Sequence, residues 1–129
     1  MPAFAPIAIT DGTDSHTFNP KIIDGNGVAA YNESSGVPVA DRRITIARNT
    51  TPQGREKVTM KLVLPVVQDQ TVNGINSPSI VRTAFVDISF SFERTSTTVE
   101  RTKARNLMIS LLADPVVGPQ VIDVLQSVY

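Results

Sequence analysis

The sequence predicts an α+β fold, in which an antiparallel multi-stranded sheet precedes two C-terminal helices. Through much of residues 1–95, apolar and polar residues alternate with a period of two, as in strands with one buried and one solvated face. From residue 96 onward the apolar residues recur at helical spacing instead. A chain of 129 residues has room for one domain. We therefore expect residues 1–129 to form a single domain, with strands over 1–95 and helices over 96–129.

The first strands are short and are separated by turn-forming residues. Residues 7–10 and 16–23 are predicted to form an N-terminal hairpin around the turn at 11–14, whose sequence is Asp-Gly-Thr-Asp. A second turn at 25–27 leads into a weaker strand near 28–33. With the longer strands that follow, this gives a hairpin plus a sheet of roughly five strands.

Two strands, 43–49 and 55–64, repeat one alternating pattern, and the loop between them has the turn chemistry of a hairpin. Pairing would gather basic and hydroxyl side chains on one face, opposite an apolar face. The polar face would carry Arg43, Thr45, Ala47, Asn49, Arg55, Lys57, Thr59, Lys61 and Val63. Guanidinium and ammonium groups bind phosphates, and threonine hydroxyls can contact base edges, so this face is a candidate RNA site. A charged, solvated surface is the alternative interpretation.

A third alternating strand, predicted over 80–94, adds an aromatic side chain to the polar face. Phe85 shares a side with Thr83, Asp87, Ser89 and Ser91. An exposed aromatic ring beside a Lys/Thr surface can stack an unpaired base, at about 1–3 kcal/mol per base. Asp87 can accept a hydrogen bond from a base amino group. Residues 68–79, rich in Gln, Asn, Gly and Ser, are expected to form a loop before this strand.

A change of period marks the helical part. Thr97 and Glu100 match a capping box at the start of a helix that Asp114-Pro115 ends. Its apolar stripe comprises Ala104, Leu107, Met108, Leu111 and Leu112. A second short helix is expected to start at Pro115 or Pro119 and to carry Val121, Ile122 and Leu125. The sequence leaves open whether these helices cover their own sheet or that of a partner.

Charge is segregated along the chain although its formal net value is zero. Between Arg42 and Lys61 there are six basic residues and one acid, Glu56. This distribution concentrates basic side chains in one part of the chain, while the neutral total keeps copies of the chain from repelling one another. The chain has no cysteine, which excludes disulfides and thiolate metal sites. No apolar run approaches transmembrane length, so no membrane partner is expected.

An enzyme is the main alternative from another class, and the sequence argues against it. His16 is the only histidine, on a predicted early strand, so no Ser/His/Asp arrangement can form without it. No glycine-rich loop leads from a strand into a helix, and no metal ligands occur at useful spacing. We expect no catalytic residues, cofactor or metal.

The ordered set of short motifs resembles the coat proteins of the small single-stranded RNA bacteriophages, the leviviruses, especially the Q-beta type. The similar stretches run nearly from end to end: Asn26-Gly27-Val28-Ala29, Val37-Pro38, Arg43-Ile44-Thr45, Asp87 to Phe92, Ser96-Thr97 with Glu100-Arg101, Leu111-Leu112-Ala113 and Tyr129. The segment from Gln70 to Pro78 looks more like the other main branch of the family.

The resemblance implies an intertwined homodimer whose subunits join their sheets and exchange helices. Copies of the dimer would close an icosahedral virion capsid around the viral genomic RNA in the host bacterial cytoplasm. The dimer would also bind an RNA stem-loop and so repress translation of the viral replicase. The inter-subunit loop of the family corresponds to Gln70, Asn73, Gly74 and Pro78. A stand-alone dimeric RNA-binding protein without a shell is the alternative, but it would have no evident use for such a loop.

The resemblance also implies roles for individual residues. The matching RNA-binding positions are Arg43, Thr45, Asn49, Arg55, Lys57, Thr59, Lys61, Phe85 and Asp87. Thr45, Thr59 and Lys61 would hold an extruded adenine, and Phe85 would stack a loop base. Phosphates would be held by Arg43, Arg55 and Lys57. Phe85 replaces the common tyrosine, Ala47 a frequent serine and Val63 an acid of one branch, so the preferred stem-loop is expected to differ from that of well-known relatives.

Overall fold

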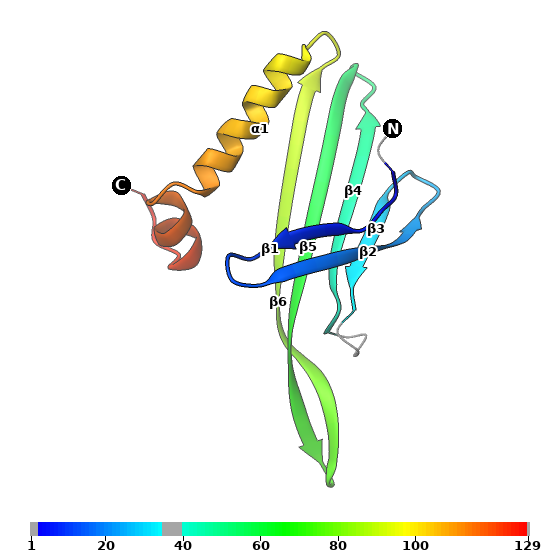
Figure 1. Cartoon of the computed structure of the whole chain (residues 1–129), viewed down its shortest axis with the longest axis vertical. Helices are drawn as coiled ribbons and strands as arrows, with labels where there is room; N and C mark the ends of the chain where they lie inside the picture. Colours follow the sequence, from blue (N-terminus) through cyan, green and yellow to red (C-terminus); the bar gives the residue numbers. More distant parts are fainter. Residues whose placement is uncertain (1–2, 35–39, 129) are drawn as a thin grey trace. The chain divides into compact units, whose positions relative to one another are not determined.

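The computed structural model describes residues 3–34 and 40–128, without the side chains of Asp69, Gln70, Val72, Ser77 and Pro78. The described strands form one curled antiparallel sheet in the order β1-β2-β3-β4-β5-β6 (Figure 1). The strands are β1 (Ile7–Thr10), β2 (Ser15–Ile23), β3 (Ala29–Glu33), β4 (Arg42–Thr50), β5 (Arg55–Val72) and β6 (Ile75–Glu93). Helix α1 (Thr98–Leu112) and a π-helical segment, η2 (Val117–Asp123), follow. The predicted α+β class is confirmed.

The chain forms two compact units, Met1–Ser91 and Phe92–Tyr129. The first holds nearly all of the sheet, and the second holds α1 and η2. Val37-Pro38 and Tyr129, which contribute to the sequence resemblance, lie outside the described residues.

Strand β2 belongs to two pairings. Its first half pairs with β1, from Thr10 opposite Ser15 to Ile7 opposite Phe18. Its second half pairs with β3, and the register shifts between Pro20 and Ile22. Proline has no N–H to donate to a ladder, so an irregularity in the pairing is expected next to it. This change of partner allows the β1–β2 hairpin to cross the sheet, as Figure 1 shows.

The core of the first unit lies where the hairpin meets the sheet. Phe18 of β2 is 2% exposed and Tyr31 of β3 is 7% exposed. The ring of Phe4 contacts Tyr31 edge to face, with centroids 5.2 Å apart. A cavity of about 420 Å³ lies beside this core, lined by Ile9, Phe18, Leu62, Leu64, Val66, Ala84 and neighbouring side chains. The hairpin therefore packs on the apolar face of the central strands.

Strands β4 and β5 form the predicted hairpin. Its turn is closed by a hydrogen bond from Thr51 N to Arg55 O of 2.8 Å and by one from Gly54 N to Thr51 O of 2.9 Å. Gly54 has a φ of 81°, which a residue without a Cβ adopts at no steric cost. The pairing continues from Thr50 opposite Glu56 to Arg43 opposite Val63.

The expected loop over residues 68–79 is wrong. β5 continues to Val72 and β6 begins at Ile75, so only Asn73 and Gly74 form the turn. Both have positive φ, 52° and 78°, as the preferred two-residue hairpin turn requires, and Asn-Gly is the favoured sequence for it. The polar composition suggested a loop, but a strand pair satisfies the backbone equally well. Gln70 and Pro78 lie in the two strands, and their side chains are outside the described part.

Helix α1 begins as predicted. Thr97 Oγ1 accepts from Glu100 N and the Glu100 carboxylate accepts from Thr97 N, both at 3.2 Å, which completes the capping box. No side chain of α1 is buried, and Leu107 is 71% exposed. None of the helices in the described part of the chain is long and apolar enough to span a membrane.

The second helical segment differs from the prediction in its start and its type. It begins at Val117 rather than at Pro115 or Pro119, and it ends at Asp123. The Asp114 carboxylate accepts from Val116 N at 2.8 Å and so satisfies the backbone just before the segment. Within it, Val121 N bonds to Val116 O at 3.3 Å, which is π-helical spacing. Leu125 lies beyond the segment, with a φ of 62°.

Candidate nucleic-acid interface

The register of β4 and β5 places the predicted RNA-binding residues on one face. Residues directly opposite each other in an antiparallel pair point to the same side of the sheet. Here Thr45 lies opposite Lys61, Ala47 opposite Thr59, and Asn49 opposite Lys57. We call this side the basic face. It comprises Arg43, Thr45, Ala47 and Asn49 of β4, Arg55, Lys57, Thr59, Lys61 and Val63 of β5, and the β6 residues that share their side.

Strand β6 joins the basic face through Ser91. Arg55 Nε donates to Ser91 Oγ at 2.8 Å and Arg55 Nη2 donates to the Ser91 carbonyl at 3.1 Å. Phe85 and Asp87 share the parity of Ser91 along the strand, so they point to the same side. Both are exposed, and the Phe85 side chain, at 72%, is among the most exposed apolar groups described. A ring this open has no role in the core of a single chain.

The cationic and hydroxyl side chains of the basic face differ in how exposed they are. The long cationic side chains of Arg43, Lys57 and Lys61 are exposed, whereas Thr45 and Thr59 are half-buried. Thr45 faces Lys61 directly, and Thr59 is the next same-side residue on β5. The three residues predicted to hold an extruded base are therefore neighbours on one side of the sheet.

The two faces of the β4–β5 hairpin differ in the carboxylates that accompany their cations. Between residues 42–50 and 55–63 the basic face has four cations and no carboxylate. On the opposite face, Arg42 Nη1 lies 2.6 Å from Glu33 Oε1, and Arg48 Nη2 lies 2.9 Å from Glu56 Oε2. Thr50 Oγ1 also donates to the Glu56 carboxylate. Positive charge is thus concentrated on the side that also carries Phe85.

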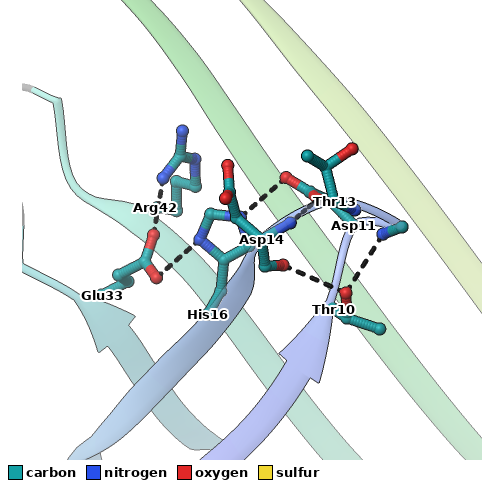
Figure 2. Close-up of polar contacts among 8 residues, drawn as sticks. Thr10, Asp11, Thr13, Asp14, His16, Glu33 and Arg42 are labelled. Carbon is teal, nitrogen blue, oxygen red and sulfur yellow. Dashed lines mark hydrogen bonds and ion pairs between the residues drawn. The ribbon is translucent and has the colours of Figure 1, made fainter.

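A second polar cluster, on the opposite face, was not predicted from the sequence. His16 of β2 has Nε2 2.8 Å from Asp11 Oδ2 and Nδ1 2.8 Å from Glu33 Oε2 (Figure 2). Glu33 also pairs with Arg42, its cross-strand partner on β4. Pairing of early strands could have suggested that His16 lies near Glu33. The contact with Asp11 spans the predicted turn at 11–14, but the turn sequence alone did not show that the Asp11 carboxylate points to His16.

Hydrogen bonds shift the pKa values of this cluster. The bond to Asp11, followed by that to Glu33, raises the pKa of His16 above its usual range. Backbone donation from Asp14, followed by the His16 contact, holds the pKa of Asp11 well below its usual range. Partial burial raises the pKa of Glu33, but donation from Arg42 and His16 outweighs it, so the net shift is downward. The residues described include no group of three or more His, Cys, Asp or Glu side chains arranged to hold a metal ion.

The chain thus combines an antiparallel sheet that has one basic face with a helix whose apolar side chains are exposed. The family comparison identifies the class directly: the levivirus coat protein family matches residues 2–129. The chain therefore belongs to the levivirus coat protein family.

Individual relatives agree with this assignment. The capsid protein of Pseudomonas phage PRR1 is 46% identical over 101 residues, which are 78% of this chain and 73% of the relative. The capsid protein of Escherichia virus Qbeta is 34% identical over 108 residues, which are 81% and 80% of the two chains. The predicted resemblance to the levivirus family is confirmed.

Solved structures show the same fold. The virus-like particle of Beihai levi-like virus 21 contains a chain that superposes with a TM-score of 0.87 at 29% identity, over 99% of both chains. The bacteriophage GA capsid protein gives a TM-score of 0.82 at 22% identity over 98% of both chains, which supports the fold alone. As a member of this family the chain is a capsid protein of the virion and not an enzyme.

Proposed function

We propose that this capsid protein forms an intertwined homodimer, that its copies close an icosahedral shell around the viral genomic RNA, and that the basic face binds an RNA stem-loop. Binding of that stem-loop would repress translation of the viral replicase. The observation that carries the RNA proposal is the joining of four cations, two half-buried threonines and one open aromatic ring on one side of β4–β6.

Strand geometry sets what this face can contact. Residues on the same side of a strand lie about 6.6 Å apart, and neighbouring strands lie about 4.8 Å apart. Lys57 and Lys61 are therefore about 13 Å apart along β5, with Arg43 and Arg55 on the same side. One RNA strand can meet several of these cations at once. Fixed on a paired hairpin, they lose little backbone freedom on binding.

Base contacts follow from the groups between the cations. The hydroxyls of Thr45 and Thr59 can donate to and accept from a base edge, and Lys61 lies directly opposite Thr45 in the strand pair. Phe85 offers a ring for stacking, and the exposed Asp87 offers an acceptor to an amino group. We assign Thr45, Thr59 and Lys61 to an unpaired adenine, Phe85 to a loop base, and Arg43, Arg55 and Lys57 to phosphates. Asn49, opposite Lys57, extends this polar surface.

The dimer proposal rests on apolar side chains that the single chain leaves open. Leu107, Ile109 and Leu111 of α1 are all exposed, as is Val86 on the apolar side of β6. Among the described residues only Phe18 and Tyr31 are buried apolar side chains. A second copy that covers these surfaces would bury about 2,000–5,000 Å² in an obligate interface. The two compact units would then act as one coat domain within the dimer.

The long β5–β6 ribbon is the proposed contact between dimers. Its turn, Asn73-Gly74, lies at the far end of both strands, and Ile75 beside it is exposed. An open apolar side chain at a hairpin tip favours contact with another copy. Gln70 and Pro78 belong to the same ribbon. The shell therefore requires the ribbon, whereas RNA binding by a dimer does not.

The RNA proposal is tested by titrating coat dimers with a labelled stem-loop from the replicase start of this phage's genome. A stem-loop that lacks the unpaired adenine serves as the matched RNA control. We expect saturable binding to the first and clearly weaker binding to the second. Equal binding to both would contradict the adenine pocket, and no binding to either would contradict the basic face as an operator site.

Assembly is tested separately on protein expressed alone and treated with nuclease. Gel filtration, the ratio of absorbance at 260 and 280 nm, and negative-stain microscopy report particle size and protected RNA. The chain has no Trp and two Tyr, so packaged RNA would dominate the spectrum. Void-volume spheres with a nucleic-acid spectrum are expected. A small species without RNA would contradict self-assembly and would favour a stand-alone RNA-binding dimer.

A further inference from the structure

Four charged side chains connect the β1–β2 hairpin to the next two strands. Asp11 lies in the hairpin turn, His16 on β2, Glu33 on β3 and Arg42 on β4. We call these four residues the clasp. His16 is at its centre, with a carboxylate oxygen 2.8 Å from each ring nitrogen (Figure 2). It lies at the edge of the cavity between the hairpin and the sheet, where Asp11, His16 and Arg42 form part of the lining.

The turn holds Asp11 ready for this contact. Its Oδ1 accepts from Thr13 N at 2.8 Å and from Asp14 N at 2.7 Å. This leaves Oδ2 directed at His16. On the other side, Glu33 divides its oxygens in the same way, with Oε1 on Arg42 and Oε2 on His16. Both carboxylates are thus fixed by other groups, so the imidazole has to match them.

Only one protonation state of the His16 imidazole can donate hydrogen bonds to both carboxylates. A neutral imidazole has one N–H and one bare nitrogen lone pair, whereas the imidazolium has two N–H donors. In the neutral state, one of the two 2.8 Å contacts would set a nitrogen lone pair against a carboxylate oxygen. The geometry is therefore that of the cation, which donates to Asp11 and Glu33 together.

We propose that the clasp is a pH-dependent fastening of the β1–β2 hairpin, closed while His16 is protonated and released at one end when it loses its proton. The hairpin supplies Phe18 to the core and covers Leu62 and Leu64. Release loosens this cover without unfolding β4–β6, which are paired independently of it. The coat protein thereby carries a local response to pH, away from the basic face.

No other charge competes for His16 among the residues that surround it. The turn contributes Asp11 and the neighbouring Asp14, β3 contributes Glu33 and β4 contributes Arg42. The β5 and β6 side chains that line the adjoining cavity, Leu62, Leu64, Pro65, Val66 and Ala84, are uncharged. The three carboxylates of Asp11, Asp14 and Glu33 outnumber the one guanidinium of Arg42, which leaves the site favourable for a further cation.

The pKa shifts determine how the stability of the clasp changes with pH. The pKa of His16 is raised above its ordinary value of 6.5, so the stabilisation is complete below pH 6.5 and is lost as pH rises through the higher folded value. The pKa values of Asp11 and Glu33 are lowered from 3.8 and 4.5, so their contribution is present above those values and is lost in stronger acid. The clasp is therefore firmest between about pH 4.5 and 6.5.

Hydrogen exchange by mass spectrometry on assembled coat protein tests the proposal. The protection of a peptide that covers residues 7–20 is divided by that of a peptide from β4–β5 in the same sample, which removes the intrinsic effect of pH on exchange. In the wild type we expect this ratio to fall several-fold between pH 6 and pH 9. A ratio that stays constant across that range would overturn the proposal.

Three variants separate the clasp from a general effect of pH. His16→Gln and Asp11→Asn should both lose the step, since neither retains an imidazolium held between two carboxylates. Asp14→Asn removes a carboxylate from the same turn but leaves the clasp intact, so it should keep the step. If His16→Gln keeps the step of the wild type, or if Asp14→Asn alone removes it, His16 is not the switch.

Discussion

The two faces of the β4–β5 hairpin are built from the same alternating sequence but have opposite uses. On one face Arg42 and Arg48 each meet a carboxylate within 3 Å, from Glu33 and Glu56, and the β1–β2 hairpin packs nearby. On the other face Arg43, Lys57 and Lys61 are exposed beside hydroxyls and an aromatic ring. Alternation sorts side chains to two sides, but only the cross-strand partners decide which charges remain available to a ligand.

Two phenylalanine residues show the same contrast between a buried and an exposed side of a strand. Phe18 and Phe85 both lie on strands with alternating sequences, yet their exposed fractions are 2% and 72%. Phe18 supports the fold of the chain, whereas Phe85 is available to something outside it. Substitutions on the two faces should therefore separate stability from RNA binding.

The largest effect is expected from Phe18→Ala. Deleting a fully buried ring leaves a cavity and should lower the free energy of unfolding by about 3–5 kcal/mol. Urea unfolding measures it, at one fixed protein concentration because dimer formation contributes to stability. Phe85→Ala is the matched control and should change stability by less than about 0.5 kcal/mol. Similar losses of unfolding free energy in both variants would mean that the Phe18 and Phe85 rings do not differ in their contribution to stability.

Phe85→Ala should instead weaken the RNA complex. Losing one stacked base costs about 1–3 kcal/mol, which is about 5- to 150-fold in Kd. Filter binding of coat dimers to the stem-loop measures this loss. Shells should still form with Phe85→Ala. Unchanged affinity would remove Phe85 from the site.

A smaller change is expected in the salt dependence of binding. If Lys61 neutralises one phosphate of a single strand, Lys61→Ala should lower the slope of log Kd against log salt by about 0.7. Arg48→Ala, which removes a cation already paired with Glu56 on the opposite face, should leave the slope unchanged. A lower slope for Arg48→Ala together with an unchanged slope for Lys61→Ala would place the RNA on the face opposite the basic face.

No effect is expected from reducing agent. The chain has no cysteine, so no disulfide can link neighbouring subunits. The thermal midpoint of the particle should therefore be the same with and without dithiothreitol. A lower midpoint with dithiothreitol would show that the particle contains a covalent link from another source.

Much of the basic face could be predicted from the sequence because strand periodicity is local. The parity of residues 43–49 and 55–63 sorted the side chains to two faces, and the register, which the sequence did not show, sets Thr45 opposite Lys61. The capping box at Thr97 was equally visible, since both partners lie within one turn of helix. Such features depend on neighbours in the chain.

The wrong prediction of a loop over residues 68–79 came from two local sequence signals that competed. Polar residues between 68 and 79 suggested a loop, although Asn73-Gly74 is itself a strong hairpin signal that should have outweighed composition. The clasp was missed for another reason. His16 reaches Glu33, and through it Arg42, only because β2 changes partners near Pro20 and pairs with β3, which is a tertiary event.

The most direct test of the two-face account is ultraviolet crosslinking of RNA to protein in purified particles, with the crosslinked residues located by mass spectrometry. Adducts are expected on the basic face, at Phe85, Lys61 and their same-side neighbours. None are expected on Phe18, Arg48 or the clasp. Adducts concentrated on the β1–β2 hairpin or on the opposite face of β4 would contradict it.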